Sequence, residues 1–237
     1  MRIKSFLLFA LIAIPALFWA QENRSSSYRK FAEFGPWIGL ANYSGDVAQN
    51  RIVLGETKAA YGVVFKYHFM PHFDVRAHFL RGDLQGSDQN SSDPGIKARN
   101  FSFFSPLTEV GAVLEYNFIE HERLTGTGVF NISVSPYVFV GGAMAFIHPD
   151  VKCESPNCPT FPEPGQKRKH FTVPAGIGLR ADLIERVSFS GEVGWRPTFA
   201  DDIDGVSLYG NKNANDWYIF FGGTLSYVFG GQKTNQF

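Results

Sequence analysis

The chain has little of what metal, redox or nucleic-acid chemistry needs. Its 237 residues include 2 cysteines and 3 methionines, and its 22 basic residues balance its 22 acidic ones. A nucleic-acid-binding domain concentrates basic charge on one surface, so this balance gives no support for a nucleic-acid partner. After the N-terminal segment, no apolar run reaches the roughly 18 residues that a membrane helix requires.

Catalytic sequence motifs are missing as well. The chain has no Gly-x-Ser-x-Gly elbow, no phosphate-binding loop and no His-Glu-x-x-His motif. The sequence therefore predicts a protein without enzymatic activity and without a cofactor, a metal or a small-molecule substrate. A small barrel enzyme that acts on lipid is the alternative.

The N-terminus has the layout of a secretory signal peptide. Arg2 and Lys4 precede an apolar run from Phe6 to Trp19, and Ala20 comes directly before a polar segment. A basic start, a short apolar middle and a small residue at the cleavage site are typical of export signals. We expect residues 1–20 to be removed and residues 21–237 to form the mature chain.

Strand and turn formers are abundant, with 24 Phe, 9 Tyr and 4 Trp beside 24 Gly. The last apolar stretch, 217–229, alternates an apolar face with a face that becomes small and polar at Gly222, Thr224 and Ser226. Its Trp and Tyr residues near the ends are typical of the aromatic girdles of membrane barrels. An exported chain without a membrane helix crosses a membrane only as a closed barrel.

Eight segments follow this alternation, at 31–43, 58–70, 73–84, 100–118, 133–147, 171–183, 187–196 and 217–229. Tight turns at 70–73 and 183–187 alternate with long polar connections at 44–57, 82–99, 148–170 and 197–216, as in barrels with short periplasmic turns and long outside loops. The prediction is an all-β fold: an eight-stranded antiparallel transmembrane β-barrel of the outer-membrane type with a filled polar lumen. The barrel would span residues 31–229 of a protein located in the outer membrane and surrounded by its lipids.

The face opposite the apolar one carries charges of both signs. These inward candidates are Lys66, His68, Asp74, Arg76, His78, Glu109, Glu115, Arg180, Glu192 and Arg196. An eight-stranded barrel is wide enough only for its own side chains, and buried charges are tolerated only when they are paired. We therefore predict an ion-pair network that fills the lumen and leaves no pore.

The two cysteines, Cys153 and Cys158, lie close together in a proline-rich connection. In an exported protein such a pair predicts a local disulfide. His148 and His170 flank the pair, so a zinc site with two cysteines and two histidines is the alternative, although the spacing fits no familiar zinc pattern.

Several stretches have a distinctive order and spacing. They are 39–46, 99–103 followed by Glu109 and 114–118, then 194–207, and finally 215–218 at the entry to the last strand. Together they resemble the PorG family of Bacteroidota outer-membrane proteins, and the likeness spans nearly the whole mature chain.

This resemblance implies an eight-stranded barrel that belongs to the type IX secretion system, which exports cargo carrying a sorting domain across the outer membrane. It also implies association with the periplasmic ring of the lipoprotein PorK and its partner PorN. The expected role is a non-enzymatic anchor or scaffold, and an adhesion or stability barrel that uses its outside loops is a further alternative. Candidate docking surfaces are the periplasmic leader 21–30 and the turn with Glu120, His121, Glu122 and Arg123. The C-terminal tail, 230–237, is expected on the same periplasmic side.

Overall fold

The computed structural model describes residues 30–44, 54–91, 93–120, 130–155, 158, 167–199, 203 and 216–230. The predicted signal peptide, nearly all of the leader and nearly all of the tail lie outside these ranges. The strands are β1 (Phe31–Ser44), β2 (Lys58–His68), β3 (Phe73–Ser87), β4 (Phe101–Asn117), β5 (Val134–Ile147), β6 (Asp150–Cys153), β7 (Arg168–Thr172), β8 (Ala175–Ile184), β9 (Val187–Pro197) and β10 (Trp217–Phe229). The short helices are η2 (Leu54–Glu56), η3 (Asp88–Asn90) and α2 (Pro94–Arg99).

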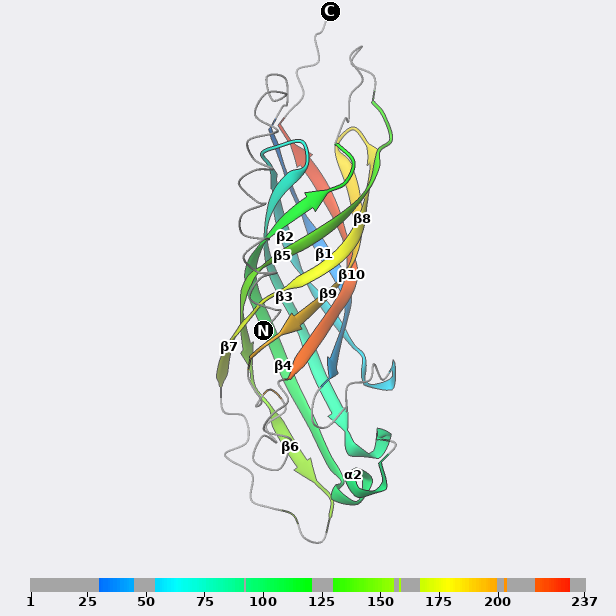
Figure 1. Ribbon diagram of the computed structural model, residues 1–237, viewed down its shortest axis with the longest axis vertical. Coiled ribbons are helices and arrows are strands. Elements are labelled where there is room, and N and C mark those ends of the chain that lie inside the picture. The colour runs from blue at the N-terminus through cyan, green and yellow to red at the C-terminus, as the bar shows by residue number, and fades with distance from the viewer. Residues whose placement is uncertain are drawn as a thin grey trace, which may run out of the picture.

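Eight of these strands close into one antiparallel ring, in the order β1, β2, β3, β4, β5, β8, β9, β10, and β10 returns to pair with β1. The pairing between β4 and β5 closes what would otherwise be an open sheet. Two further strands, β6 and β7, lie between β5 and β8 in the sequence. β6 pairs with β4, and β7 pairs with β5. The ring confirms the predicted eight-stranded barrel (Figure 1).

The register of the ring defines how strongly its strands are staggered. Paired residues lead once around the barrel from Asn117 through Tyr137, Gly178, Glu192, Gly222, Gly39, Ala60 and Gly82 to Leu107. The path returns to β4 ten residues before its start, because 117 minus 107 is 10. This stagger tilts the strands by roughly 40° and gives a barrel just wide enough for its own side chains.

Side chains alternate between the two faces of every strand in the ring. The outward face carries exposed large apolar residues on all eight strands, for example Phe34, Tyr61, Phe79, Ile177 and Leu225. The inward face holds nearly all of the buried polar and charged residues of the ring. Because apolar groups face outward and polar groups inward, the ring is a transmembrane barrel of the outer-membrane type with a filled lumen.

Inward glycines leave room for large aromatic side chains. Gly39 and Gly222 are paired across β1 and β10, and the indole of Trp37 lies over both of them. A Cβ added at Gly39 would come within 2.5 Å of Trp37 Cη2, and one at Gly222 within 2.6 Å of Trp37 Cζ2. These two inward glycines therefore provide the space that the Trp37 indole occupies.

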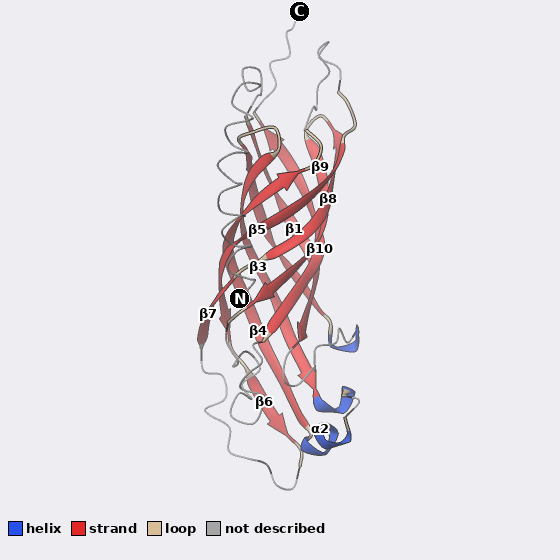
Figure 2. Cartoon of the chain, viewed as in Figure 1, coloured by secondary structure: helices blue, strands red, loops and turns tan. Residues whose placement is uncertain are grey.

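One end of the barrel is far more elaborate than the other. Tight connections join β2 to β3 and β8 to β9 at one end, whereas η2, η3, α2, β6 and β7 all lie at the opposite end (Figure 2). The predicted loops 82–99 and 148–170 are thus partly ordered, because β3 continues to Ser87 and β6 extends the wall along β4. No helix within the part of the chain that the structure describes has the length and apolar character to cross a membrane.

Candidate functional site

The candidate site is the lumen, which contains three layers of paired charges. The layer nearest the tight turns is centred on His68, which is fully buried. His68 Nδ1 lies 2.6 Å from Asp74 Oδ1, and His68 Nε2 lies 3.2 Å from Glu33 Oε1. The Phe31 ring stacks on the imidazole at a centroid distance of 4.0 Å, and Arg180 Nη1 lies 3.2 Å from both ring nitrogens.

Arg180 links this layer across the barrel. Its Nη2 donates to Glu33 Oε1 and lies 3.1 Å from Asp182 Oδ1 on its own strand, β8. The hydroxyl of Ser188 donates to the other oxygen of Glu33 at 3.0 Å. β1, β2, β3, β8 and β9 are therefore connected at one level, which ties together both sides of the lumen.

The middle layer is centred on Arg76 of β3. Arg76 Nε lies 2.7 Å from Glu115 Oε1, and Arg76 Nη1 lies 2.5 Å from Glu192 Oε2. Lys66 Nζ lies 2.6 Å from the second oxygen of Glu115, and the hydroxyl of Tyr137 donates to Glu192 Oε2 at 2.8 Å. Two carboxylates from β4 and β9 thus share three donors, and this sharing limits the free-energy penalty of their burial.

The third layer is centred on Glu109 of β4, which has no exposed surface. Its Oε1 lies 2.9 Å from His78 Nε2 and 3.5 Å from Arg196 Nε, and its Oε2 accepts from the Tyr218 hydroxyl at 2.5 Å. The guanidinium of Arg196 also lies over the Phe220 ring, 4.9 Å from its centroid. Phe220 marks the change from the charged part of the lumen to an apolar part.

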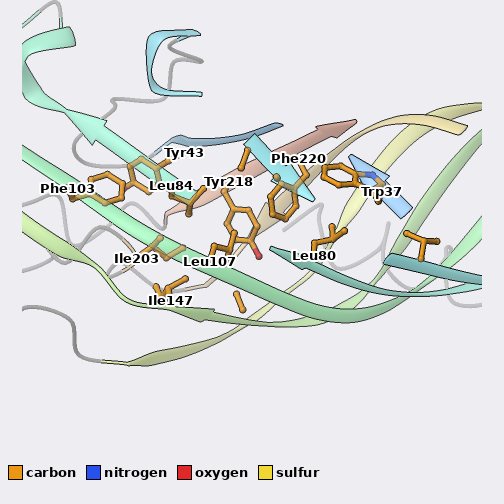
Figure 3. Packing of buried hydrophobic residues seen from close by; sticks show 14 of the residues in the cluster. Trp37, Tyr43, Leu80, Leu84, Phe103, Leu107, Ile147, Ile203, Tyr218 and Phe220 are labelled. Atoms are coloured by element: carbon orange, nitrogen blue, oxygen red, sulfur yellow. The ribbon is translucent and has the colours of Figure 1, made fainter. Parts of the chain in front are cut away.

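Beside the third layer and beyond it, the lumen is filled largely by apolar side chains (Figure 3). This apolar cap includes Trp37, Tyr43, Leu80, Leu84, Phe103, Leu107, Ile147, Ile203 and Phe220. The sequence predicts an ion-pair network throughout the lumen, so the apolar filling near the long loops differs from that prediction. Its physical reason is that the inward positions there carry Leu, Phe and Ile, which exclude water without needing partners.

Ile203 enters this cap from the long connection between β9 and β10, and it is fully buried. Asp216 holds the connection in place: its Oδ2 accepts from the Ile203 amide at 3.0 Å and its Oδ1 accepts from the Tyr43 hydroxyl at 2.6 Å. The Thr198 hydroxyl donates to the backbone carbonyl of Asp216 at 2.7 Å. These contacts fix Ile203 beside Tyr43 at the outer end of the lumen.

The ten residues predicted to form the lumen network all lie on the inner face, and none is more than 7% exposed. Each of them contacts an oppositely charged or histidine side chain in the three layers. Four further residues of these layers were not predicted: Glu33, Asp182, Tyr137 and Tyr218. Their inward orientation could have been predicted from the alternation of side chains along a strand. Asp182 lies two residues from Arg180 and Glu33 lies two residues from Phe31, so each shares the inner face with that neighbour.

The predicted disulfide between Cys153 and Cys158 is confirmed. Because both thiols are consumed in this bond, the alternative zinc site with these cysteines is excluded. The described residues also contain no group of three or more His, Cys, Asp or Glu side chains that could hold a metal ion.

The predicted docking turn is only partly within the described ranges, because His121, Glu122 and Arg123 lie outside them. Glu120 is at the rim, where its Oε1 lies 3.3 Å from His72 Nε2 of the tight turn between β2 and β3. His72 Nδ1 lies 2.8 Å from the backbone carbonyl of Asn117. His72 therefore joins two connections at the end of the barrel that carries the short turns.

At the opposite end, a ridge formed by η2, η3 and α2 is built around two buried carboxylates. Asp88 accepts two hydrogen bonds of 2.8 Å from the Arg99 guanidinium and one of 2.9 Å from the Phe101 amide. Glu56 Oε1 accepts from Asn90 Nδ2 at 2.7 Å and from the Ser87 amide at 2.8 Å. Burial raises the pKa of Glu56, and these hydrogen bonds oppose the rise only in part.

The charged side chains of the lumen contact one another in pairs and small groups. His68 and His78 are buried against carboxylates, and no serine contacts either ring in the described part of the chain. A nucleophile with its base needs an opening through which substrate can reach it, and the lumen is filled at each level.

Several solved outer-membrane barrels have a similar fold. The attachment invasion locus protein Ail of Yersinia pestis is 10% identical, with a TM-score of 0.45, over 85% of this chain and 98% of Ail. OprG of Pseudomonas aeruginosa is 13% identical, with a TM-score of 0.47, over 85% and 98%. Neisserial surface protein A is 10% identical, with a TM-score of 0.47, over 83% and 96%. At this level of identity and TM-score, the comparisons carry no functional argument.

No curated protein matches the chain. One family model matches residues 14–235, a range that contains every strand of the barrel and both of its rims. The chain accordingly belongs to the family described as "Domain of unknown function (DUF6089)".

Proposed function

We propose that this chain is a non-enzymatic outer-membrane component of the type IX secretion system. In this role the barrel anchors or scaffolds the periplasmic ring of PorK and PorN at the outer membrane. The resemblance to the PorG family supports this assignment, and it rests on the stretches 39–46, 99–103 with Glu109 and 114–118, 194–207 and 215–218. The proposal includes export to the outer membrane with removal of residues 1–20.

The observation that carries the anchoring role is the filled lumen. Arg180, Arg76 and Glu109 connect opposite walls at three levels, and Ile203 completes an apolar cap above them. A barrel of this width has no room for both these side chains and a water path. Such a barrel supports attachment at its rims better than it supports transport through its interior.

The rim with the short turns is the surface that a periplasmic partner would reach. Its connection between β4 and β5 is much longer than the two tight turns beside it, and Glu120 at its start is tethered to His72. A long, polar connection on a rim of otherwise minimal turns is a suitable docking element, since loops positioned by a rigid scaffold commonly carry function.

An enzyme that acts on lipid is less well supported. It would need a histidine and a hydroxyl or acid on the lipid-facing wall, within hydrogen-bond reach of each other. His68 and His78 instead face inward and contact Asp74 and Glu109. Of the remaining described histidines, His72 is bound to Asn117 and Glu120 at the rim.

An adhesion or stability barrel is a second candidate, and the ordered outer ridge favours it. The ridge is held by the Asp88–Arg99 pair and by Glu56, and the nearby β6 ends in the disulfide of Cys153. A rigid projection beyond the membrane could present a binding surface. This candidate predicts normal secretion of type IX cargo in a deletion strain, whereas the scaffold role predicts its loss.

The deciding experiment is a mild-detergent pull-down of the tagged protein from outer membranes. We expect PorK and PorN to be recovered with the wild-type barrel, and to be lost when the turn 120–123 is replaced by a short glycine-containing turn. The matched control replaces a different exposed turn of the same rim, Glu185 and Arg186 between β8 and β9, by Asn-Gly and should retain the ring. A folded wild-type barrel that is recovered alone would refute the scaffold role.

A further inference from the structure

The outer wall formed by β8 and β7 has an unbroken apolar face that ends in two lysines. From the turn end outward, every second residue faces the membrane: Leu183, Ala181, Leu179, Ile177, Ala175, Val173, Phe171, Lys169 and Lys167. The apolar part of this series covers twelve residue steps, since 183 minus 171 is 12. With ~3.3 Å per residue and a tilt of roughly 40°, it spans about 30 Å along the barrel axis.

That length accounts for the whole apolar band of an outer-membrane barrel, which is about 25 Å tall. Lys169 and Lys167 therefore begin where the acyl chains end and the lipid head groups start. Long basic side chains at such a position extend their charge into the head-group layer. The lysines lie on the side of the long connections, which faces outward from the cell in barrels of this type.

The surroundings of Lys169 form a surface with an apolar lower part and a cationic upper part. Lys169 is paired with Phe146 of β5, and its Nζ lies 5.7 Å from the centroid of that ring. Phe171 is paired with Met144, and these two side chains are 55% and 38% exposed. Neither Lys167 nor Lys169 forms a salt bridge with any residue that the structure describes, and both are exposed.

We propose that Lys167 and Lys169 bind the phosphate groups of a lipid in the outer leaflet, whose acyl chains cover Phe146 and Phe171. Two neighbouring ammonium groups that have no salt-bridge partner among the described residues complement a phosphate-bearing head group, and basic pockets next to apolar membrane segments bind such head groups. A soluble anionic partner would use the charges alone, whereas a lipid also uses the aromatic and aliphatic surface directly below them.

The test uses the full-length mature barrel refolded in detergent, with lipid A as the probe and native mass spectrometry as the readout. Each basic residue near an anionic head group is worth about a factor of five in binding. The variant with Lys167→Gln and Lys169→Gln should therefore bind lipid A about 25-fold more weakly. Lipid A from which the phosphates have been removed should bind wild-type protein about as weakly.

The matched control carries Lys97→Gln and Lys152→Gln. These exposed lysines lie at the same end, on α2 and β6, further from the apolar band, and they change the net charge equally. We expect the control to bind lipid A within about twofold of wild type. If both double variants bound lipid A equally weakly, the effect would come from net charge alone and the proposed site would be refuted. Undiminished binding by the Lys167 and Lys169 variant, with its heat-modifiable gel mobility intact, would also overturn the proposal.

Discussion

The middle layer of the lumen makes a direct prediction about Arg76, which we expect to be the most costly of the lumen cations to replace. Arg76 bridges Glu115 of β4 and Glu192 of β9, and its guanidinium carbon lies 4.8 Å from the centroid of the Phe139 ring. The substitution Arg76→Met keeps much of the aliphatic stem and its packing against Phe139. It removes the charge that the two carboxylates share.

The expected loss of unfolding free energy depends on which partners Glu115 and Glu192 keep when Arg76 is replaced. Breaking a buried ion pair by removing one partner typically lowers the free energy of unfolding by about 3–5 kcal/mol. Glu115 keeps Lys66 at 2.6 Å, and Glu192 keeps the Tyr137 hydroxyl at 2.8 Å, so neither becomes isolated. We therefore expect Arg76→Met to cost about 3 kcal/mol, at the lower end of that range. Adding Glu192→Gln should restore about 1 kcal/mol, because it removes the charge that lost its partner.

The assay is equilibrium urea unfolding of the refolded barrel in lipid vesicles, followed by tryptophan fluorescence. The matched control is Arg81→Met on the same strand, whose side chain faces outward, is exposed and has no salt bridge in the described part of the chain. Surface substitutions of this kind change stability by about 0.5 kcal/mol or less. Equal unfolding free energies for Arg76→Met and Arg81→Met would refute the conclusion that the ion pairs hold the lumen together.

Three further predictions concern the outer end of the barrel. Ile203→Ala should lower the local stability of the apolar cap by about 2–4 kcal/mol. The expected readout is faster cleavage by added protease near that residue, while the barrel stays folded. Replacing Cys153 and Cys158 by serine should release a short loop worth about 2 kcal/mol locally, measured by hydrogen exchange in β6, with the unfolding midpoint of the ring unchanged. Because the pKa of Glu56 is raised in the folded state, its stabilising contribution is complete below the ordinary pKa of about 4.5 and is lost as the pH rises through the raised value. Thermal unfolding of the outer ridge should lose this pH dependence in Glu56→Gln, and a slope that persists in the variant would contradict the assignment.

Strand alternation and connection length were enough to predict the architecture. Phe31, Lys58, Phe73, Val187 and Trp217 begin predicted strands and also begin β1, β2, β3, β9 and β10. The reason is physical: a membrane barrel needs an apolar residue at every second position on the lipid side, and this period is visible in the sequence. The same alternation predicts that Arg76 and Glu192 face the lumen, even when the pairing of the strands is not known.

Pairing itself could not be read from the sequence. Arg76 and Glu192 are far apart in the chain and meet only because the register brings β3 opposite β9 across the lumen. Ile203 was missed for a related reason: it lies in a connection, where the period of two gives no information about burial. The extension of β5 into β6 was also hidden, since the cysteine-bearing segment has the composition of a loop while its backbone pairs with β4.

The lumen charges also fix the register on which the rims depend. A slip of one residue along β3 would turn Arg76 and Asp74 outward into lipid, where a charge at the midplane costs about 2–4 kcal/mol. The same slip would break their contacts with Glu115 and His68, so the penalties of exposure and lost pairing act together. Because the register is held so firmly, substitutions inside the barrel should lower its stability and its amount in the membrane without changing what a folded barrel binds. Substitutions at the turn that begins at Glu120 should weaken binding without lowering the stability of the barrel or its amount in the membrane. This opposite pattern would distinguish a barrel that acts through its rim from one that acts through its interior.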